Sequence, residues 1–416
     1  MDKLLIIADD FTGALDTGVQ FASIGTSTCV VTDPRCDYEG LGDSFQVLVV
    51  DAESRHLPPR EAHDVVFNAV QGARDAGFTG VYKKTDSALR GNIGAELSAA
   101  LSAAEADSLA FFPSFPRMGR VTRGGIHYIN DIPVAESMFG EDPFEPVRRS
   151  AVAEIIGQQT DVPVTLHSVG DVMCEGGGIH VFDASTDQDL QEAALELKLS
   201  GNVPAVMAGC AGFAAVLPEL MGVPADTRRS VPRLTGKLLT ICGSVNPITM
   251  AQLDEAERAG ALRLRLAPYQ KLSEGWVKTL DGRKITADWV EQIQKTDNAI
   301  IECGVNDRYE TAAWAENMHL TLDETRQRIA NTMGDVLERV LYLGLERDIL
   351  ITGGDTLLSF MNRIGLNMLI PLGEAVPGVV LSQLRYGGRS YNLMTKSGGF
   401  GERSLLIDLV DHGKSH

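Results

Sequence analysis

Two adjacent carboxylates, Asp9 and Asp10, directly follow an apolar run, Leu4–Ala8, and precede a turn at Gly13. The apolar run predicts a buried strand, and in a parallel sheet ligands bind outside the carboxyl ends of the strands. The first N–H groups of the helix that follows favour anions. In one interpretation, one acid caps this helix and the other forms a surface salt bridge. In the other, one carboxylate accepts hydrogen bonds from a polyol or acts as a base toward a hydroxyl group.

Arg55 follows a second apolar run, Val47–Val50, so it is predicted at the same edge of the sheet. A planar guanidinium group there is suited to a bidentate grip on the carboxylate of a substrate. The alternative is a surface arginine that pairs with Glu53 or Glu61.

A dense polar segment follows the short apolar run Val81–Tyr82 and precedes Gly91-Asn92, where a helix is predicted to begin. Such a density of polar groups at a strand end indicates a binding site. The candidate substrate-binding residues, with Asp9 and Arg55, are Lys84, Thr85, Asp86, Ser87 and Arg90. We favour Lys84, Asp86 and Arg90 as contacts, and Asp86 joins Asp10 as a candidate catalytic acid or base.

Residues 113–146 contain five prolines and little helical periodicity, which predicts a long functional loop. Arg117, Arg120 and Arg123 lie three residues apart in it. Such spacing is typical of a solvated basic face, but in an acidic chain it also fits a mobile positive loop over an anionic substrate. We interpret His127 as a buried structural histidine rather than a base.

Three glycine-rich turns follow predicted strands in the second half of the chain. Glycine lets the backbone approach a phosphate, and free N–H groups can point at its oxygens. The candidate nucleotide-binding residues are Ser244, Gly353, Gly354, Asp355, Thr356, Gly398 and Gly399. Asp355 is the candidate ligand for Mg²⁺, with catalytic base and helix cap as its alternative roles.

Several common fingerprints are absent from the sequence. It holds no Gly-x-x-x-x-Gly-Lys-[Ser/Thr] and no strand-linked Gly-x-Gly-x-x-Gly, so neither a P-loop ATPase nor a standard dinucleotide dehydrogenase is supported. His-Glu-x-x-His and Gly-x-Ser-x-Gly are also missing.

The elements that must position these residues alternate between short apolar runs and helical periodicity, as in 60–76 and 187–199. This pattern predicts an α/β chain of two domains, each a mostly parallel sheet flanked by helices, with the site in the cleft between them. A polar, basic, proline-containing stretch marks the boundary. We therefore expect a substrate-binding domain at 1–222, a linker at 223–236 and a nucleotide-binding domain at 237–416.

The composition excludes several classes of protein. At 416 residues the chain exceeds one typical domain of about 150 residues. A formal net charge of −19 disfavours nucleic acid as a partner. The apolar run at the N-terminus is too short for a signal peptide or a membrane helix, so we expect a cytoplasmic protein. The six cysteines are dispersed and are predicted to be free thiols.

The motifs quoted above, together with Phe112-Pro113, Gly119-Arg120 and Lys396 to Gly401, resemble those of the four-carbon acid sugar kinases. The resemblance extends from Ile7 to Phe400. It implies an N-terminal acid-sugar domain, a C-terminal nucleotide domain, and phosphorylation of the terminal hydroxyl by ATP with Mg²⁺. The first motif is most similar to the D-threonate kinase branch, with D-erythronate and 3-oxo-tetronate kinases as close alternatives.

Two hypotheses for a different class of function remain open from the sequence. The first is a non-catalytic sensor that binds a nucleotide and a metabolite without transfer. The second is an aldolase or dehydrogenase, which would need a Schiff-base lysine, such as Lys84, or a nicotinamide fingerprint. The partners expected are small molecules, with no nucleic acid or membrane, and a homodimer is left open.

Overall fold

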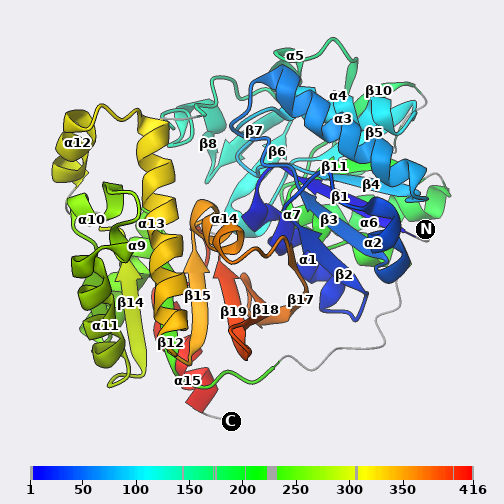
Figure 1. Cartoon of the computed structure of the whole chain (residues 1–416). Coiled ribbons are helices and arrows are strands. Elements are labelled where there is room, and N and C mark those ends of the chain that lie inside the picture. The colour runs from blue at the N-terminus through cyan, green and yellow to red at the C-terminus, as the bar shows by residue number, and fades with distance from the viewer. Residues whose placement is uncertain are drawn as a thin grey trace. The chain divides into compact units, whose positions relative to one another are not determined.

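The computed structural model describes residues 3–142, 145–171, 173, 176–201, 203–222, 232–304, 308–396 and 398–414. The chain divides into two compact units, 1–229 and 230–416 (Figure 1). Most of the predicted linker, residues 223–231, lies outside the described residues.

The N-terminal unit is a parallel sheet whose strands lie in the order β2-β3-β1-β4-β11-β5-β10-β9. The strands are β1 (Leu4–Ala8), β2 (Thr28–Val31), β3 (Val47–Asp51), β4 (Gly80–Lys84), β5 (Ser108–Phe112), β9 (Val164–His167), β10 (Gly178–Phe182) and β11 (Val206–Gly209). The helices are α1 (Phe11–Ala22), α2 (Tyr38–Ser44), α3 (Pro59–Asp75), α4 (Ile93–Ala103), α5 (Val152–Gly157), α6 (Asp187–Ser200), α7 (Ala211–Ala214) and α8 (Leu217–Leu220).

This strand order explains where a ligand can bind. The chain runs from β1 to β2 and β3 on one side of the sheet and then crosses to β4 on the other side of β1. The direction of winding therefore reverses around β1, and such a switch point opens a crevice at the carboxyl ends of the strands. The residues predicted to do chemistry follow β1, β3 and β4, the three strands at this point.

The prediction that residues 113–146 form a loop without regular structure is wrong for part of the segment. It contains an antiparallel sheet of β6 (Arg120–Arg123), β7 (Ile126–Ile129) and β8 (Ile132–Pro133). Short 3₁₀ turns at Pro116–Met118 and Val134–Glu136 flank it. Gly124 and Gly125 have φ values of 59° and 73°, which suit the two-residue turn of a tight hairpin.

The C-terminal unit has a second sheet in the order β13-β14-β12-β15-β19-β18-β17. Its strands are β12 (Leu238–Cys242), β13 (Leu262–Arg265), β14 (Asn298–Glu302), β15 (Asp348–Thr352), β17 (Pro371–Val376), β18 (Val379–Tyr386) and β19 (Arg389–Lys396). The short strand β16 (Met368–Leu369) is not part of this order. Strands β13, β14, β12, β15 and β19 are parallel to one another, but β18 pairs antiparallel with both β19 and β17, which was not predicted from the sequence. The helices are α9 (Pro247–Arg258), α10 (Pro268–Leu272), α11 (Leu280–Ile293), α12 (Arg308–Asn317), α13 (Leu322–Tyr342), α14 (Gly354–Arg363) and α15 (Leu405–Lys414), with a 3₁₀ turn at Trp276–Lys278.

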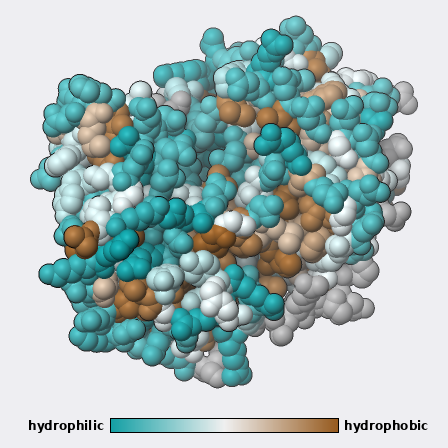
Figure 2. Space-filling model, viewed as in Figure 1, coloured by the Kyte–Doolittle hydropathy of each residue, from teal (hydrophilic) through white to brown (hydrophobic). Residues whose placement is uncertain are grey.

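Hydrophilic side chains cover most of the face in Figure 2, with hydrophobic side chains interspersed. Among the described residues, every helix is too short or too polar to span a membrane. The described cysteines are free thiols, as predicted, and Cys174 lies outside the described residues.

Candidate functional site

Asp10 caps the helix that follows β1, which is one of the roles that the sequence allowed. Its side chain caps α1 by accepting hydrogen bonds from Gly13 N at 3.0 Å and Thr12 Oγ1 at 2.9 Å. Gly13 leaves room for two side chains, because a Cβ atom at this position would lie 2.5 Å from Asp10 Oδ1 and 2.6 Å from Lys84 Nζ. The turn after β1 thus brings a lysine and a carboxylate together at the strand end.

Arg55 joins the ends of the three strands at the switch point. Its guanidinium donates to Asp9 Oδ2 at 2.7 Å and Asp10 Oδ2 at 2.9 Å, and it lies 3.7 Å from Asp86 Oδ1. The Arg55 side chain is 10% exposed, so the alternative of a surface arginine is wrong. Burial by itself raises the pKa of Asp10, but Arg55 and Lys84 outweigh burial and bring that pKa to about 2. Asp10 is therefore ionised near neutral pH.

The segment after β4 wraps around Asp86. Arg90 donates to both carboxylate oxygens of Asp86, at 2.9 and 3.0 Å, and also contacts Asp142 at 3.3 Å. Although burial raises the pKa of Asp86, Arg90 and Arg55 hold it well below its usual range. Leu89 has a φ of 61°, a strained conformation that is common where a binding loop is over-determined by its surroundings.

Three buried polar atoms at these strand ends have no hydrogen-bond partner among the described residues. They are Asp9 Oδ1, Asp51 Oδ2 and Thr85 Oγ1. Buried polar atoms are nearly always satisfied in native structures, so such exceptions indicate a ligand or water. Lys84 Nζ donates to Thr85 O at 2.9 Å and forms no ion pair with a described carboxylate.

A buried ion pair that was not predicted from the sequence lies next to these residues. Lys83 Nζ lies 2.9 Å from Glu96 of α4, and neither side chain is more than 1% exposed. Ser54 Oγ also donates to Glu96, and Asn92 Nδ2 donates to Ser54 O at 2.9 Å. These bonds fix the turn that carries Arg55. The available signal was a single acid in the otherwise small and apolar run 93–103.

Of the three arginines in the segment 113–146, the structure brings only Arg120 to the site. Its Nη1 donates to Ser87 Oγ. Arg117 and Arg123 are exposed and pair with Asp187 and Asp131. A solvated basic face is therefore the right interpretation for these two arginines but the wrong one for Arg120.

His127 is buried, as expected of a structural histidine. Its ring bonds Thr122 Oγ1 at 3.0 Å and Ser87 O at 2.9 Å. Burial lowers the pKa of His127 to about 4, so the ring is neutral at physiological pH. It positions Ser87 and is unsuited to hold a proton near pH 7.

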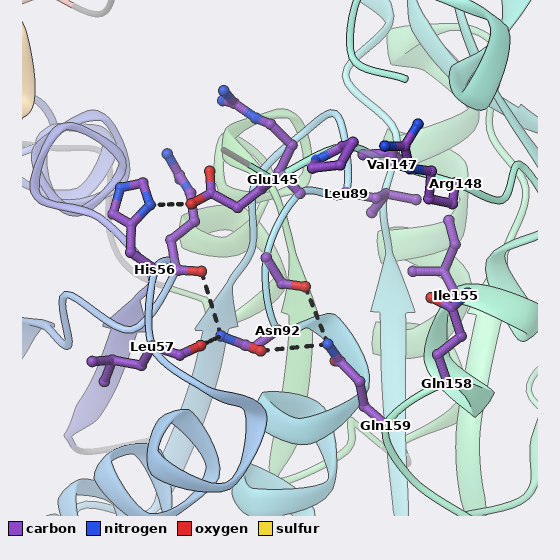
Figure 3. Close-up of a pocket in the computed structure, with 14 residues that line it drawn as sticks. His56, Leu57, Leu89, Asn92, Glu145, Val147, Arg148, Ile155, Gln158 and Gln159 are labelled. Atoms are coloured by element: carbon purple, nitrogen blue, oxygen red, sulfur yellow. Dashed lines mark hydrogen bonds and ion pairs between the residues drawn. The ribbon is translucent and has the colours of Figure 1, made fainter. Parts of the chain in front are cut away.

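A cavity of about 340 Å³ adjoins the site on the side of the β3 and β4 turns (Figure 3). Its walls are 55–57, 89–92, 145–148 and the end of α5. Asn92 and Gln159 point toward each other across it, with Gln159 Nε2 donating to Asn92 Oδ1 at 3.4 Å. Since Asn92 also donates to Leu57 O at 2.8 Å, these amides are occupied by protein partners.

In the C-terminal unit, the three glycine-rich turns lie together at the carboxyl ends of β12, β15 and β19. A Cβ atom on Gly353 would lie 3.4 Å from Ser244 N, and one on Gly398 would lie 2.8 Å from Ser244 Oγ. A Cβ atom on Gly243 would overlap Thr356 Oγ1. The close approach of these backbones, together with the N-terminus of α14, forms a cradle suited to phosphate groups. Gly354 opens α14 and Gly399 follows Gly398, while Ser397 lies outside the described residues.

Two charged residues beside the cradle have different roles. Lys396 is buried, and its Nζ donates to Phe400 O at 3.0 Å, so it shapes the glycine loop. Asp355 lies in the first turn of α14 and is half-exposed, with Oδ2 accepting from Arg326 at 2.8 Å. It does not cap the helix, since Gly353 is the N-cap residue. The described residues hold no group of three His, Cys, Asp or Glu that could enclose a metal ion.

Comparison with known proteins gives a family match for each of the two units. A model described as a sugar-binding N-terminal domain matches residues 4–217, and one described as a nucleotide-binding C-terminal domain matches residues 239–406. A D-threonate kinase of Salmonella typhimurium is 28% identical, with 98% of this chain and 97% of that protein covered. A D-erythronate kinase of Heliobacterium modesticaldum is 29% identical, with 99% and 97% covered. The crystal structure of a Haemophilus influenzae protein has the same fold, with a TM-score of 0.70, 22% identity and 99% of each chain covered.

Proposed function

Because this chain belongs to the four-carbon acid sugar kinase family, we propose that it transfers the γ-phosphoryl group of ATP to the terminal C4 hydroxyl of a four-carbon sugar acid. D-threonate, giving D-threonate 4-phosphate, is the substrate we propose first. D-erythronate and 3-oxo-tetronate are the alternatives within the family. The observation that carries the proposal is the cluster of ionised carboxylates, cations and unpartnered polar atoms at the switch point of the N-terminal sheet.

The substrate contacts we propose are Asp9, Lys84, Thr85, Ser87 and the arginines around them. Asp9 Oδ1 and Thr85 Oγ1 are polar atoms whose hydrogen bonds substrate hydroxyl groups can supply. Lys84 Nζ is a cation without a described carboxylate partner, which favours an anionic ligand.

Asp10 and Asp86 have low pKa values, so they suit orientation of a hydroxyl group better than strong proton abstraction. This is sufficient for phosphoryl transfer, whose catalysis rests mainly on positioning and charge stabilisation. We propose that Asp10 orients the acceptor hydroxyl, with Asp86 and Asp355 as the other candidates for a catalytic role.

For the nucleotide, we propose that Ser244, Gly353, Gly354, Thr356 and the turn at 398–399 hold the phosphate groups. Their backbones approach closely enough for N–H groups to face phosphate oxygens. Asp355 fits a magnesium ion that arrives with the nucleotide, since Mg²⁺ takes one or two carboxylates and keeps water and phosphate oxygens as its other ligands. When bound, the ion neutralises charge on the phosphates.

The test is ADP release by the full chain with ATP and Mg²⁺, screened over D-threonate, D-erythronate, their L-isomers, the 3-oxo acids and 4-hydroxythreonine. We expect one four-carbon acid to exceed the others in kcat/KM, with the phosphate at C4 by ³¹P–¹H NMR. Binding of acid and nucleotide by calorimetry without ADP release would favour a sensor. Cleavage or oxidation of the acid without ATP would favour an aldolase or a dehydrogenase. Light scattering tests whether the chain forms a homodimer, which the sequence left open.

A further inference from the structure

The arginines around Asp86 differ in how they are neutralised. Arg55 is held by Asp9 and Asp10, and Arg90 grips both oxygens of Asp86. Most of the donors of these two side chains therefore already have carboxylate partners in the protein.

Arg120 lacks such a partner. Among the described residues its guanidinium donates to the hydroxyl of Ser87 and forms no ion pair with a carboxylate. Burial lowers the pKa of Arg120, the attraction of Asp86 opposes this effect, and the nearby Arg90 adds repulsion. A half-buried cation of this kind gains most from an anionic ligand that brings its own charge into the site.

The surroundings of Arg120 hold it in place beside the predicted substrate segment. The guanidinium carbons of Arg120 and Arg90 each lie 5.2 Å from the centre of the Phe139 ring. The residue starts β6, and its backbone pairs with Phe115. Ser87, its hydrogen-bond partner, is fixed from the other side by His127. A guanidinium held in this way loses little freedom on binding a planar carboxylate.

From this arrangement we infer that Arg120 is the residue that binds the carboxylate group of the substrate and so selects acids over neutral polyols of the same length. The inference rests on the proposed function and deepens it. It assigns to Arg120 the binding of the substrate carboxylate that the sequence suggested for Arg55. Arg55 then holds the carboxylates of the protein itself.

The experiment measures binding of D-threonate to the full-length protein by calorimetry, without nucleotide. The same protein is titrated with D-threitol, in which a CH₂OH group replaces the carboxylate. Arg120→Gln should weaken D-threonate binding about 10- to 100-fold and leave D-threitol binding within about twofold, because only the acid loses a charge-assisted pair. Arg120→Lys keeps the positive charge but loses the planar guanidinium that can donate two parallel hydrogen bonds. It should retain part of the affinity for D-threonate.

Arg117→Gln and Arg123→Gln are the matched controls, because both arginines are exposed, lie three residues from Arg120 and pair with surface acids. Both should bind D-threonate as the unaltered protein does. An Arg120→Gln protein that keeps full affinity for D-threonate, or that loses both ligands equally, overturns the inference. Absence of binding of every four-carbon acid by the unaltered protein overturns the proposed function, and the inference with it.

Discussion

Arg55→Ala tests whether the site is assembled by charge. The substitution removes the cation that Asp9 and Asp10 contact at 2.7 and 2.9 Å and that stands 3.7 Å from Asp86. The three carboxylates at the strand ends then repel one another, because less positive charge remains to neutralise them. Because Asp9 is 3% exposed and Asp86 8%, water cannot replace the guanidinium.

The magnitude follows from the pKa of Asp10. Its folded value of about 2 lies below the ordinary 3.8. At about 1.4 kcal/mol per pKa unit, this difference corresponds to about 2 kcal/mol of stability at neutral pH. Asp86, whose pKa Arg55 also lowers, adds to it, so the variant should lose about 3–5 kcal/mol, the range for breaking a buried ion pair.

The loss should depend on pH. In the unaltered protein, the contribution of Asp10 is present above its unfolded pKa near 3.8 and is lost as pH falls toward 2. In the variant, burial without Arg55 raises the pKa values of Asp10 and Asp86, so they take up protons at higher pH and the unfavourable charge disappears. The difference between the two proteins should therefore shrink as pH falls from 7 to 4.

The assay is hydrogen exchange by mass spectrometry on peptides from β1 and β4, which reports unfolding of the N-terminal unit in the intact chain. Arg35→Ala is the control, since Arg35 is 90% exposed and pairs only at the surface with Asp33. In kinetics, Arg55→Ala should raise the KM for the sugar acid far more than the KM for ATP, because Arg55 holds Asp9 and Asp10 in the proposed acid site. A loss below about 1 kcal/mol, or one that is the same at pH 7 and pH 4, would refute the charge-based assembly.

Three further outcomes are expected. Gly243→Ala should weaken ATP binding at least about tenfold by calorimetry, because the added Cβ would displace Thr356 from the cradle. Asp355→Asn should weaken the Mg²⁺ dependence of ATP binding if the residue serves the metal, and should lower kcat alone if it is the base. Glu96→Gln should destabilise the N-terminal unit by about 3 kcal/mol in the same exchange assay, because it leaves the fully buried ammonium of Lys83 without its counter-charge.

Each of these has a control and a contrary result. Gly157→Ala adds a Cβ atom that meets nothing within 4 Å, so it should leave ATP binding unchanged. Equal effects of Gly243→Ala and Gly157→Ala on ATP binding would contradict a phosphate-binding cradle at Gly243. Normal turnover with normal Mg²⁺ dependence in Asp355→Asn would exclude both roles. Glu105→Gln removes an acid that is 74% exposed and should cost less than about 1 kcal/mol, so a similar loss for Glu96→Gln would contradict the buried pair.

The sequence by itself determined the fold class and the edges at which chemistry takes place. Continuous short apolar runs such as Leu4–Ala8 favour strands covered on both faces, and the structure gives β1 those same bounds. Since parallel strands place their carboxyl ends together, the polar residues after β1, β3 and β4 were predictable as neighbours. Glycine turns after strands likewise indicated the nucleotide cradle.

Only the tertiary structure decided which side chains are partners. Arg55 could have paired locally, but the order β3-β1-β4 delivers Asp9, Asp10 and Asp86 to it from two other strand ends. Three arginines with identical spacing are equivalent in sequence, yet in the structure Arg117 and Arg123 are exposed and only Arg120 is half-buried, next to Ser87. Strand order and hairpin pairing are long-range properties, set by how apolar surfaces are buried together, so the residues on either side of a charge do not determine its partner.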